Sequence, residues 1–329
     1  MEATVSAHVL STAKKGHVTQ CLAVAELLGI EIQEVIQARG INKAWPRWRQ
    51  EVDKLKWLVT ALRMAWNFRG GKNIIFSSGR SVLPATRLIK LLRGNQCLVL
   101  HIGSPKHWKR RCADIVLRFD HEREPGVDED TRYPWNPHQI WVSAPICLPL
   151  PTTDTDNREV TVLMGGLNIT YGDDVKSYSA LLAGLDSLVQ KEVVNIVFSR
   201  RTKADVVEAV KQRYGQTGAR LIKADDQQGF MASCENAGVF LVTPDSITMV
   251  AEAYATGKSV YVADITIKRT DTRNFRFIDK AIESGQVQVF EGEIDFDRRK
   301  IDRSDVDEAR ASMLGIIADW KEDPSSLSG

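Results

Sequence analysis

The chain has 329 residues, of which 43% are hydrophobic and 26% are charged, and its formal net charge is +2. This is the composition of a globular protein, and the length predicts two domains of ordinary size. No apolar run approaches the roughly 20 residues of a membrane-spanning helix, and the five cysteines form no CxxC pair, which argues against a disulfide framework or a zinc site. The first residues show no basic region followed by an apolar core, so we expect no secretory signal and a cytoplasmic protein.

The charge is distributed unevenly along the chain. Residues 1–150 contain 22 Lys and Arg against 13 Asp and Glu, whereas the remaining residues contain 22 against 29. All six histidines and seven of the eight tryptophans also lie in the first half. A basic half suits nucleic acid, an anionic membrane or a phosphorylated acceptor. Because the basic half has no recognised nucleic-acid motif and the second half is acidic, we expect no nucleic-acid partner.

The first half alternates between strand and helix patterns. Its predicted strands are residues 4–10, 31–38, 73–78, 96–102, 114–119 and 139–144, and its predicted helices are residues 18–28, 46–68 and 82–92. Strands that alternate with helices predict a doubly wound, Rossmann-like domain, here residues 1–150.

Two glycine-containing loops follow strands of this domain. Gly16 and His17 lie after the first strand, and Gly79 and Arg80 follow the third. We predict that Gly16, Gly79 and Arg80 bind substrate. A histidine at the carboxyl end of a strand could act as a general base or bind an anion. The alternative is that His17 is a loop histidine that hydrogen-bonds to the backbone. The GxxxxGK[ST] pattern is absent, so this loop is not a P-loop, and the absence of GxGxxG weakens a nicotinamide-dehydrogenase interpretation.

The helix predicted over 46–68 is amphipathic. Its apolar stripe consists of Leu55, Leu58, Val59, Leu62 and Trp66, which predicts that this side faces the core. Tryptophans that alternate with basic residues also suit anionic lipid headgroups. We expect Trp57 and Trp66 in the core, and for Trp45 and Trp48 both interpretations stay open.

Residues 149–159 are polar and contain proline, which indicates an interdomain linker. The pattern then restarts. Strands are predicted at 160–164, 195–198, 219–223, 239–242 and 259–262, and helices at 175–190, 230–235, after Ser246 and at 275–284. We predict a second Rossmann-like domain over 158–304. A C-terminal helix and tail, 305–329, packs back on the first domain in this prediction, and its last nine residues fray.

Polar motifs follow three strands of the second domain, where open α/β sheets bind ligands. They are Gly165-Gly166, Ser199-Arg200-Arg201 and Thr243-Pro244-Asp245-Ser246. Paired arginines and a helix N-terminus both suit a diphosphate. Glu252, less than two turns into the following helix, suits a sugar hydroxyl. The alternatives are an ordinary capped βαβ unit and arginines that are simple surface charge.

Together these blocks resemble the elongated-mitochondria (mitochondrial fission) family and its bacterial relatives, which are predicted glycosyltransferases of the GT-B fold. The matching blocks are Gly16 to Gly29, Ser78-Gly79-Arg80, Met164-Gly165-Gly166, Ser199 to Thr202 and Thr243 to Lys258, with a weaker match from Phe275 to Gly292. The chain departs from the pattern at Phe119-Asp120-His121-Glu122, where the resemblance leads us to expect a Pro-x-His-Asp turn.

The resemblance implies an α/β protein with two Rossmann-like domains that face each other across a cleft, and a nucleoside-diphosphate sugar held by the second. Arg200 and Arg201 would bind the diphosphate beside Gly165 and Gly166. Further donor-pocket residues would be Ser199, Thr243, Asp245, Ser246, Met249 and Glu252. His17 would be the base, with Asp120 and Glu122 as further candidates. No metal and no other cofactor are expected.

The predicted function is therefore a metal-independent glycosyltransferase that acts on a lipid-linked or cell-surface glycan, with peripheral membrane contact through the basic first domain. Two alternatives remain open. The first is a nucleotide-sugar epimerase, because sugar 2-epimerases share the GT-B architecture. The second is a non-catalytic adaptor at a membrane, as the family name suggests.

Overall fold

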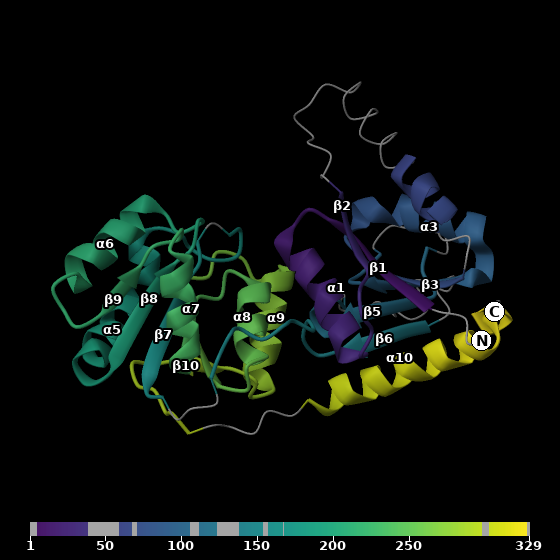
Figure 1. The fold of residues 1–329 in the computed structure, drawn as a ribbon. Coiled ribbons are helices and arrows are strands. Elements are labelled where there is room, and N and C mark those ends of the chain that lie inside the picture. The colour runs from purple at the N-terminus through teal and green to yellow at the C-terminus, as the bar shows by residue number, and fades with distance from the viewer. Residues whose placement is uncertain are drawn as a thin grey trace. The chain divides into compact units, whose positions relative to one another are not determined.

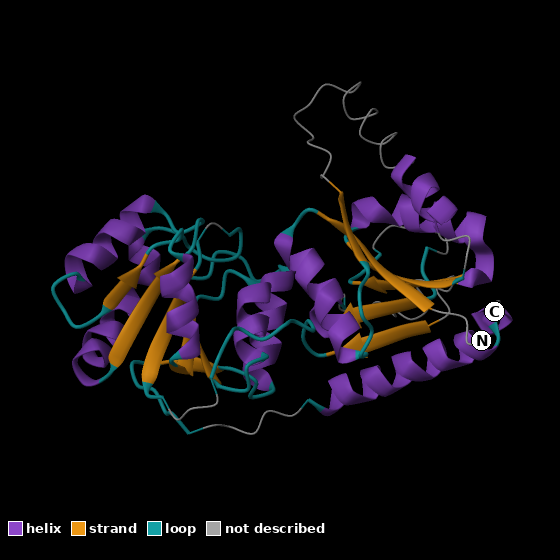
Figure 2. Ribbon diagram, in the orientation of Figure 1, coloured by secondary structure: helices purple, strands orange, loops and turns teal. Residues whose placement is uncertain are grey.

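The structure is a computed structural model that describes residues 5–38, 59–67, 71–105, 112–123, 138–153, 157–166, 168–297 and 303–327. The chain forms two compact units. Unit 1 is Met1–Ile146 with Arg303–Gly329, and unit 2 is Cys147–Asp302. Each contains a six-stranded parallel sheet with helices on its faces (Figures 1 and 2). The predicted α/β fold class, with two Rossmann-like domains, is confirmed.

The sheet of unit 1 has the strand order β2-β1-β3-β4-β5-β6. Its strands are β1 (Val5–Thr12), β2 (Glu34–Ala38), β3 (Lys72–Ser78), β4 (Cys97–Ile102), β5 (Ile115–Phe119) and β6 (His138–Val142). Its helices are α1 (Lys15–Leu27), α3 (Leu83–Arg93), α10 (Ser304–Glu322) and helical residues 59–67, with short 3-10 turns η2 (Arg80–Val82), η3 (Gly94–Gln96), η4 (Asp120–Glu122) and η6 (Pro324–Leu327). Because β2 and β3 lie on opposite sides of β1, the carboxyl ends of β1 and β3 form the switch point, where such sheets bind ligands.

The sheet of unit 2 has the strand order β12-β11-β10-β7-β8-β9. Its strands are β7 (Glu159–Met164), β8 (Val193–Phe198), β9 (Arg220–Ile222), β10 (Ala237–Val242), β11 (Ser259–Ala263) and β12 (Gln288–Phe290), the last without a counterpart among the predicted strands. Its helices are α5 (Ser179–Lys191), α6 (Ala204–Tyr214), α7 (Gln227–Glu235), α8 (Ile247–Tyr254), α9 (Arg273–Glu283) and the 3-10 turn η5 (Val175–Tyr178). Here the switch point lies between β7 and β10.

The core of each unit lies between its sheet and the helices. In unit 1 one cluster joins Leu10, Ile75 and Val99 of the sheet to Ile89 of α3 and to Ala61 of the helical segment 59–67. In unit 2 a second cluster joins alternate residues of β7, β8, β10 and β11 to α5 and α6. Parallel strands covered on both faces read as continuous apolar runs, which is why the sequence pattern located them.

Two helix predictions differ from the structure. Helix α1 begins at Lys15 rather than 18, so Gly16 and His17 lie in its first turn. In residues 59–67 the buried side chains are Ala61, Met64 and Ala65, whereas Trp66 is 63% exposed. The predicted apolar stripe is therefore wrong over its described part, and so is the core assignment of Trp66. The predictions for Trp45, Trp48 and Trp57 lie outside the described residues.

The C-terminal segment belongs to unit 1. Helix α10 packs against β6, the Ser143 N–H donates to Asp305 Oδ2 at 2.7 Å, and the Arg310 guanidinium donates to the Leu27 carbonyl at 2.8 Å. Trp320 is fully buried, and its Nε1 donates to the Asn95 carbonyl at 2.6 Å. The tail prediction is wrong for Pro324–Leu327, which form η6 with Leu327 buried.

Candidate functional site

The carboxyl edge of the unit 2 sheet holds a hydrogen-bonded network of predicted site residues. The Gly165 N–H donates to Thr243 Oγ1 at 2.7 Å, and that hydroxyl donates to Asp245 Oδ1 at 2.6 Å. The Gly166 N–H donates to Asp245 Oδ2 at 3.0 Å. These bonds join the loop after β7 to the loop after β10 at the switch point.

Both glycines are needed because other groups approach their backbone closely. A Cβ on Gly165 would lie 1.9 Å from Asp245 Oδ1, and one on Gly166 would lie 1.8 Å from the Arg201 carbonyl oxygen. Such distances are impossible for a real side chain. The turn therefore lets the Asp245 carboxylate and the Arg201 backbone come in contact with the end of β7.

The network also orients Arg201. Its Nη2 lies 3.3 Å from Asp245 Oδ2, and its side chain is 49% exposed while that of Asp245 is 4% exposed. Burial raises the pKa of Asp245, against the opposing effects of the Thr243 and Gly166 hydrogen bonds and the Arg201 charge. Arg201 thus keeps a solvent-facing guanidinium whose position is fixed by a buried carboxyl group.

Ser199 holds the turn that carries the two arginines. Its N–H donates to the Met164 carbonyl at 3.0 Å, and its Oγ accepts from the Arg201 N–H at 3.1 Å. Arg200 in the same turn is exposed, with no hydrogen bond or ion pair to any described residue. The two predicted diphosphate ligands therefore differ in how firmly the protein holds them.

A hollow of about 540 Å³ opens beside this network. Its basic side chains are Arg201, Arg269 and Arg273, and Asp271 pairs with Arg269 at 2.7 Å. Among the described residues, the hollow is lined by Asn168, Ile169, Thr170, Arg201, Asp245, Ser246, Ile247, Arg269, Asp271, Thr272, Arg273 and Asn274. Three guanidinium groups beside a helix N-terminus make this hollow suited to an anion.

Helix α8 begins at the edge of the hollow. Ser246 is its N-cap and accepts from the Met249 N–H at 3.4 Å, which agrees with the predicted cap at Asp245 or Ser246. Met249 itself is half-buried. Glu252 does not line the hollow. Burial raises the pKa of the Cys147 thiol to about 12, and the negative charge of Glu252 adds to this shift. Ser246 therefore lines the hollow, whereas Glu252 lies outside it.

Sequence reasoning missed the second loop of the hollow, 264–272, which follows β11. The Asn168 side chain donates to the Asp245 carbonyl, and Thr170 Oγ1 lies 2.8 Å from Thr272 Oγ1. Asp173 pairs with Lys203 and Lys268, each at 3.0 Å, and these hydrogen bonds lower its pKa. One signal for this loop was present in the sequence, namely the strand predicted at 259–262. Because neighbouring strands of such a sheet are parallel, the carboxyl ends of β11 and β10 lie at the same edge, and so do the loops that follow them.

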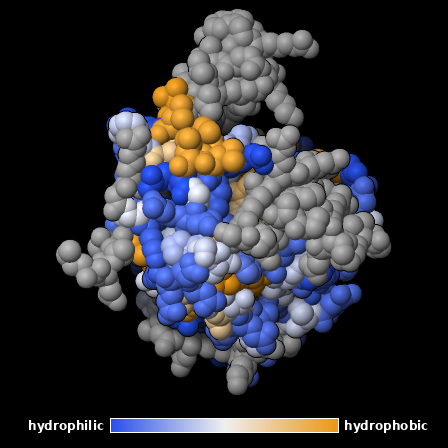
Figure 3. All heavy atoms as spheres, turned by 90° about the vertical axis from the view of Figure 1, so that its right-hand side faces the viewer, coloured by the Kyte–Doolittle hydropathy of each residue, from blue (hydrophilic) through white to orange (hydrophobic). Residues whose placement is uncertain are grey.

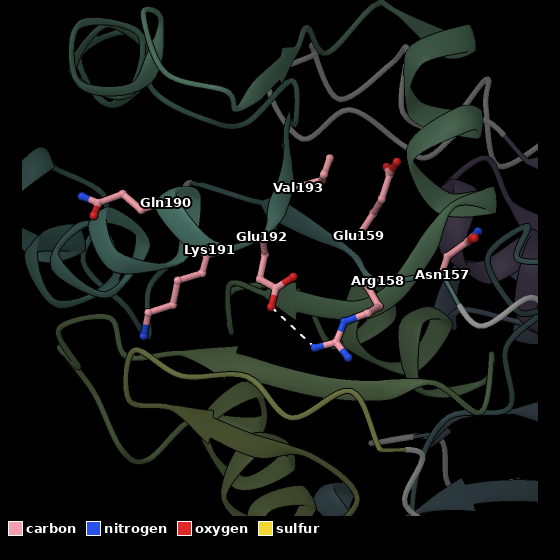
Figure 4. Close-up of a pocket in the computed structure, with 7 residues that line it drawn as sticks. All are labelled: Asn157, Arg158, Glu159, Gln190, Lys191, Glu192 and Val193. Carbon is pink, nitrogen blue, oxygen red and sulfur yellow. Dashed lines mark ion pairs between the residues drawn. The ribbon is translucent and has the colours of Figure 1, made fainter.

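A second hollow of about 460 Å³ lies at the amino ends of β7 and β8 (Figure 4). Arg158 and Glu192 point toward each other there, with 3.7 Å between Nη2 and Oε1. Glu159 accepts from Asn195 and pairs with Arg220. Because its charged side chains are engaged in ion pairs, including those of Lys191 with Glu293 and of Glu159 with Arg220, and because it lies at the opposite edge of the sheet, this hollow is not our candidate site.

The predicted residues of unit 1 meet at its own switch point. His17 Nδ1 lies 2.5 Å from Thr12 Oγ1, and a Cβ on Gly79, whose φ is +94°, would lie 2.7 Å from His17 Nδ1. Burial and the Lys14 charge lower the pKa of His17. Burial lowers the pKa of the neighbouring His101 to about 3. The pair is therefore uncharged at neutral pH.

The other candidate site residues of unit 1 have different surroundings from those of His17 and Gly79. Arg80 is exposed, and Asp120 pairs with Arg123 at 3.0 Å in the turn after β5. Glu122 is 7% exposed.

Among the residues that the structure describes, no group of three or more His, Cys, Asp or Glu side chains is placed to hold a metal ion, and all five cysteines are buried free thiols. No helix in the described part of the chain is long and apolar enough to cross a membrane.

Solved structures with a similar fold include MurG from Acinetobacter baumannii, at 14% identity over 98% of this chain and 94% of that chain, with a TM-score of 0.48. UDP-GlcNAc 2-epimerase from Neisseria meningitidis bound to UDP-GlcNAc is 11% identical over 97% and 93%, with a TM-score of 0.45. Os79 from O. sativa in complex with UDP is 12% identical over 98% and 94%, with a TM-score of 0.49.

No curated protein matches the chain significantly in sequence. The model of one protein family, described as Mitochondrial fission ELM1, matches residues 15–314, which include the switch point of unit 2 and, in unit 1, His17 and Gly79. The family expected from the sequence motifs is confirmed: the chain belongs to the mitochondrial fission ELM1 family.

Proposed function

We propose that this protein is a glycosyltransferase that binds a nucleoside-diphosphate sugar in unit 2 and transfers the sugar to a lipid-linked or cell-surface glycan without a metal ion. One observation carries the proposal. The buried Thr243–Asp245 network holds the half-exposed Arg201 beside a hollow with three arginines. The other parts of the proposed mechanism rest on residues at the same edge and at the switch point of unit 1.

The diphosphate is the group that this edge suits best. Arg201 and the exposed Arg200 supply guanidinium donors, and the N-terminus of α8 adds a partial positive charge. When the bond from the anomeric carbon to the diphosphate breaks, negative charge grows on the leaving oxygen. Fixed positive groups stabilise that charge, which is the role that a metal ion has in other enzymes.

His17 is the proposed general base. Its lowered pKa keeps the imidazole neutral, and if Nδ1–H donates to Thr12, Nε2 is free to accept a proton. The acceptor hydroxyl gives its proton to this nitrogen while its oxygen bonds to the anomeric carbon. The products are the glycosylated acceptor and the nucleoside diphosphate.

The test is a thermal-shift panel of nucleoside diphosphates on the wild-type protein and on Arg201→Ala. We expect at least one to raise the unfolding temperature, and Arg201→Ala to weaken its binding by roughly 10- to 100-fold, as for a lost charge-assisted hydrogen bond. Arg220→Ala, which removes an exposed ion pair at the other edge of the sheet, is the matched control and should bind like the wild type. Failure of every nucleotide to bind would overturn the proposal.

Product analysis then separates the reactions. Incubation of the bound donor with glycan acceptors should release nucleoside diphosphate and extend the acceptor. An isomerised donor without acceptor would identify an epimerase, and a bound but unchanged donor would indicate an adaptor.

A further inference from the structure

Two helices of unit 1 expose large apolar side chains on the side away from their sheet. In residues 59–67, Val59 is 57%, Leu62 45% and Trp66 63% exposed. On α3, Leu91 is 69% and Leu92 51% exposed. Figure 3 looks onto the side of the molecule where these helices lie in Figure 1, and it shows apolar side chains gathered in a patch. Exposed patches of this kind mark interaction surfaces more often than single exposed residues do.

Packing fixes the direction in which these side chains point. Ala61, Met64 and Ala65 belong to the same core cluster as Ala85 and Ile89 of α3. That cluster lies on one face of the sheet, so both helices cover the same face. With about 100° per residue, Val59, Leu62 and Trp66 lie opposite Ala61, Met64 and Ala65. Their exposure is therefore a consequence of the packed helix and not of a frayed end.

The charges on these helices are of one sign. Residues 59–67 contain Arg63 and no acidic residue, and α3 contains Arg87, Lys90 and Arg93 and no acidic residue. Lys90 points inward and pairs with Asp114 at 2.8 Å. Arg63 is exposed among the apolar side chains, and Arg87 is half-buried. We call these outward faces of 59–67 and α3 the apolar–basic face.

We propose that the apolar–basic face docks on an anionic lipid bilayer. Apolar side chains enter the headgroup boundary, tryptophan prefers that depth, and arginines bind acidic headgroups. A second copy of the chain fits this face poorly, because a twofold interface would bring the arginines of both copies together. The proposal concerns membrane attachment and is independent of the sugar chemistry proposed for unit 2.

The test is cosedimentation of the full chain with vesicles of phosphatidylcholine alone or mixed with phosphatidylglycerol. We expect binding to the anionic vesicles and much weaker binding to the neutral ones. Leu62→Asp combined with Trp66→Asp should reduce the bound fraction about tenfold or more, and Arg63→Glu should reduce it roughly tenfold on anionic vesicles only. Leu91→Asp tests the second helix independently.

Matched controls lie on unit 2. Ile282→Asp on α9 places the same charge at another partly exposed apolar residue, and Lys211→Glu on α6 reverses another exposed charge. Both should bind vesicles like the wild type, and circular dichroism should show that every variant is folded. Equal binding by wild type and face variants, or no binding to anionic vesicles, would overturn the proposal. So would a dimer that Leu62→Asp dissociates while vesicle binding is absent.

Discussion

At the scale of single residues, Asp245 is the carboxyl group on which the unit 2 site depends. Burial raises its pKa above the ordinary value of 3.8. The native state then holds the proton more tightly than the unfolded chain, so this stabilisation is complete below the ordinary pKa and is lost as pH rises through the raised pKa. Asp245→Asn keeps the shape and removes the titration. We expect the unfolding free energy of the wild type, relative to Asp245→Asn, to fall over this pH range in urea titrations. A difference that stays constant with pH would contradict this assignment.

Gly166 tests how closely the loops of the site pack. Because an added Cβ would lie 1.8 Å from the Arg201 carbonyl, Gly166→Ala must displace the backbone of the turn that carries the arginines. We expect a loss of about 1–3 kcal/mol in unfolding free energy, as for overpacking, together with weaker nucleotide binding. Gly218→Ala is the control, because nothing lies within 4 Å of its added Cβ. Equal stability of the two variants would show that the turn has room.

The contribution of His17 to stability also depends on pH, but in the opposite direction from that of Asp245. Burial, and after it the Lys14 charge, lowers its pKa below the ordinary 6.5. The native state therefore binds the proton less tightly than the unfolded chain, and stability is lost as pH falls from 6.5 toward the lowered pKa. We expect Lys14→Met to raise the pKa of His17, measured from its ring nitrogens by NMR. Lys176→Met in unit 2 is the control and should leave that pKa unchanged.

At the scale of elements, the sequence located the strands well because buried parallel strands are continuous apolar runs. It failed on the helix over 59–67 because the stripe argument assumes that the larger apolar side chains face inward. Here Ala61 and Ala65 face inward instead, and Leu62 and Trp66 face outward. The loop 264–272 was missed for another reason. Thr272 meets Thr170 only after folding brings together segments that are about a hundred residues apart.

The N-cap of α8 connects helix stability to the site. Ser246→Ala removes the acceptor for the Met249 N–H and should lower the unfolding free energy by about 0.5–2 kcal/mol. Asp226→Ala removes the N-cap of α7, whose side chain accepts from the Gly229 N–H, and should cost a similar amount. If α8 supports the donor site, only Ser246→Ala weakens nucleotide binding in calorimetry. Equal losses of binding would remove the special role of α8.

At the scale of the whole molecule, the candidate residues separate into two groups that each lie at a switch point. From the sequence we placed Gly166, Arg201 and Asp245 at strand ends, and in the structure Asp245 bonds directly to the other two. We did not predict that Asp245 is a buried organiser of Arg201, because burial and hydrogen bonding depend on which loops meet. Likewise the contact between Thr12 and His17 follows from the first turn of α1, which begins earlier than its pattern indicated.

The last helix tests whether the two units unfold separately. Helix α10 follows unit 2 in the chain but packs in unit 1, where Trp320 is fully buried and bonds to Asn95. Trp320→Ala should therefore destabilise unit 1 by about 3–5 kcal/mol, as other large truncations in a core do.

Calorimetry can separate the two units. A bound nucleoside diphosphate should raise the unfolding temperature of unit 2 and so identify its transition. We expect Trp320→Ala to lower the other transition only. Tyr214→Ala, which truncates a buried side chain of unit 2, should lower the nucleotide-sensitive transition instead. One shared transition that both variants lower equally would show that the units unfold together.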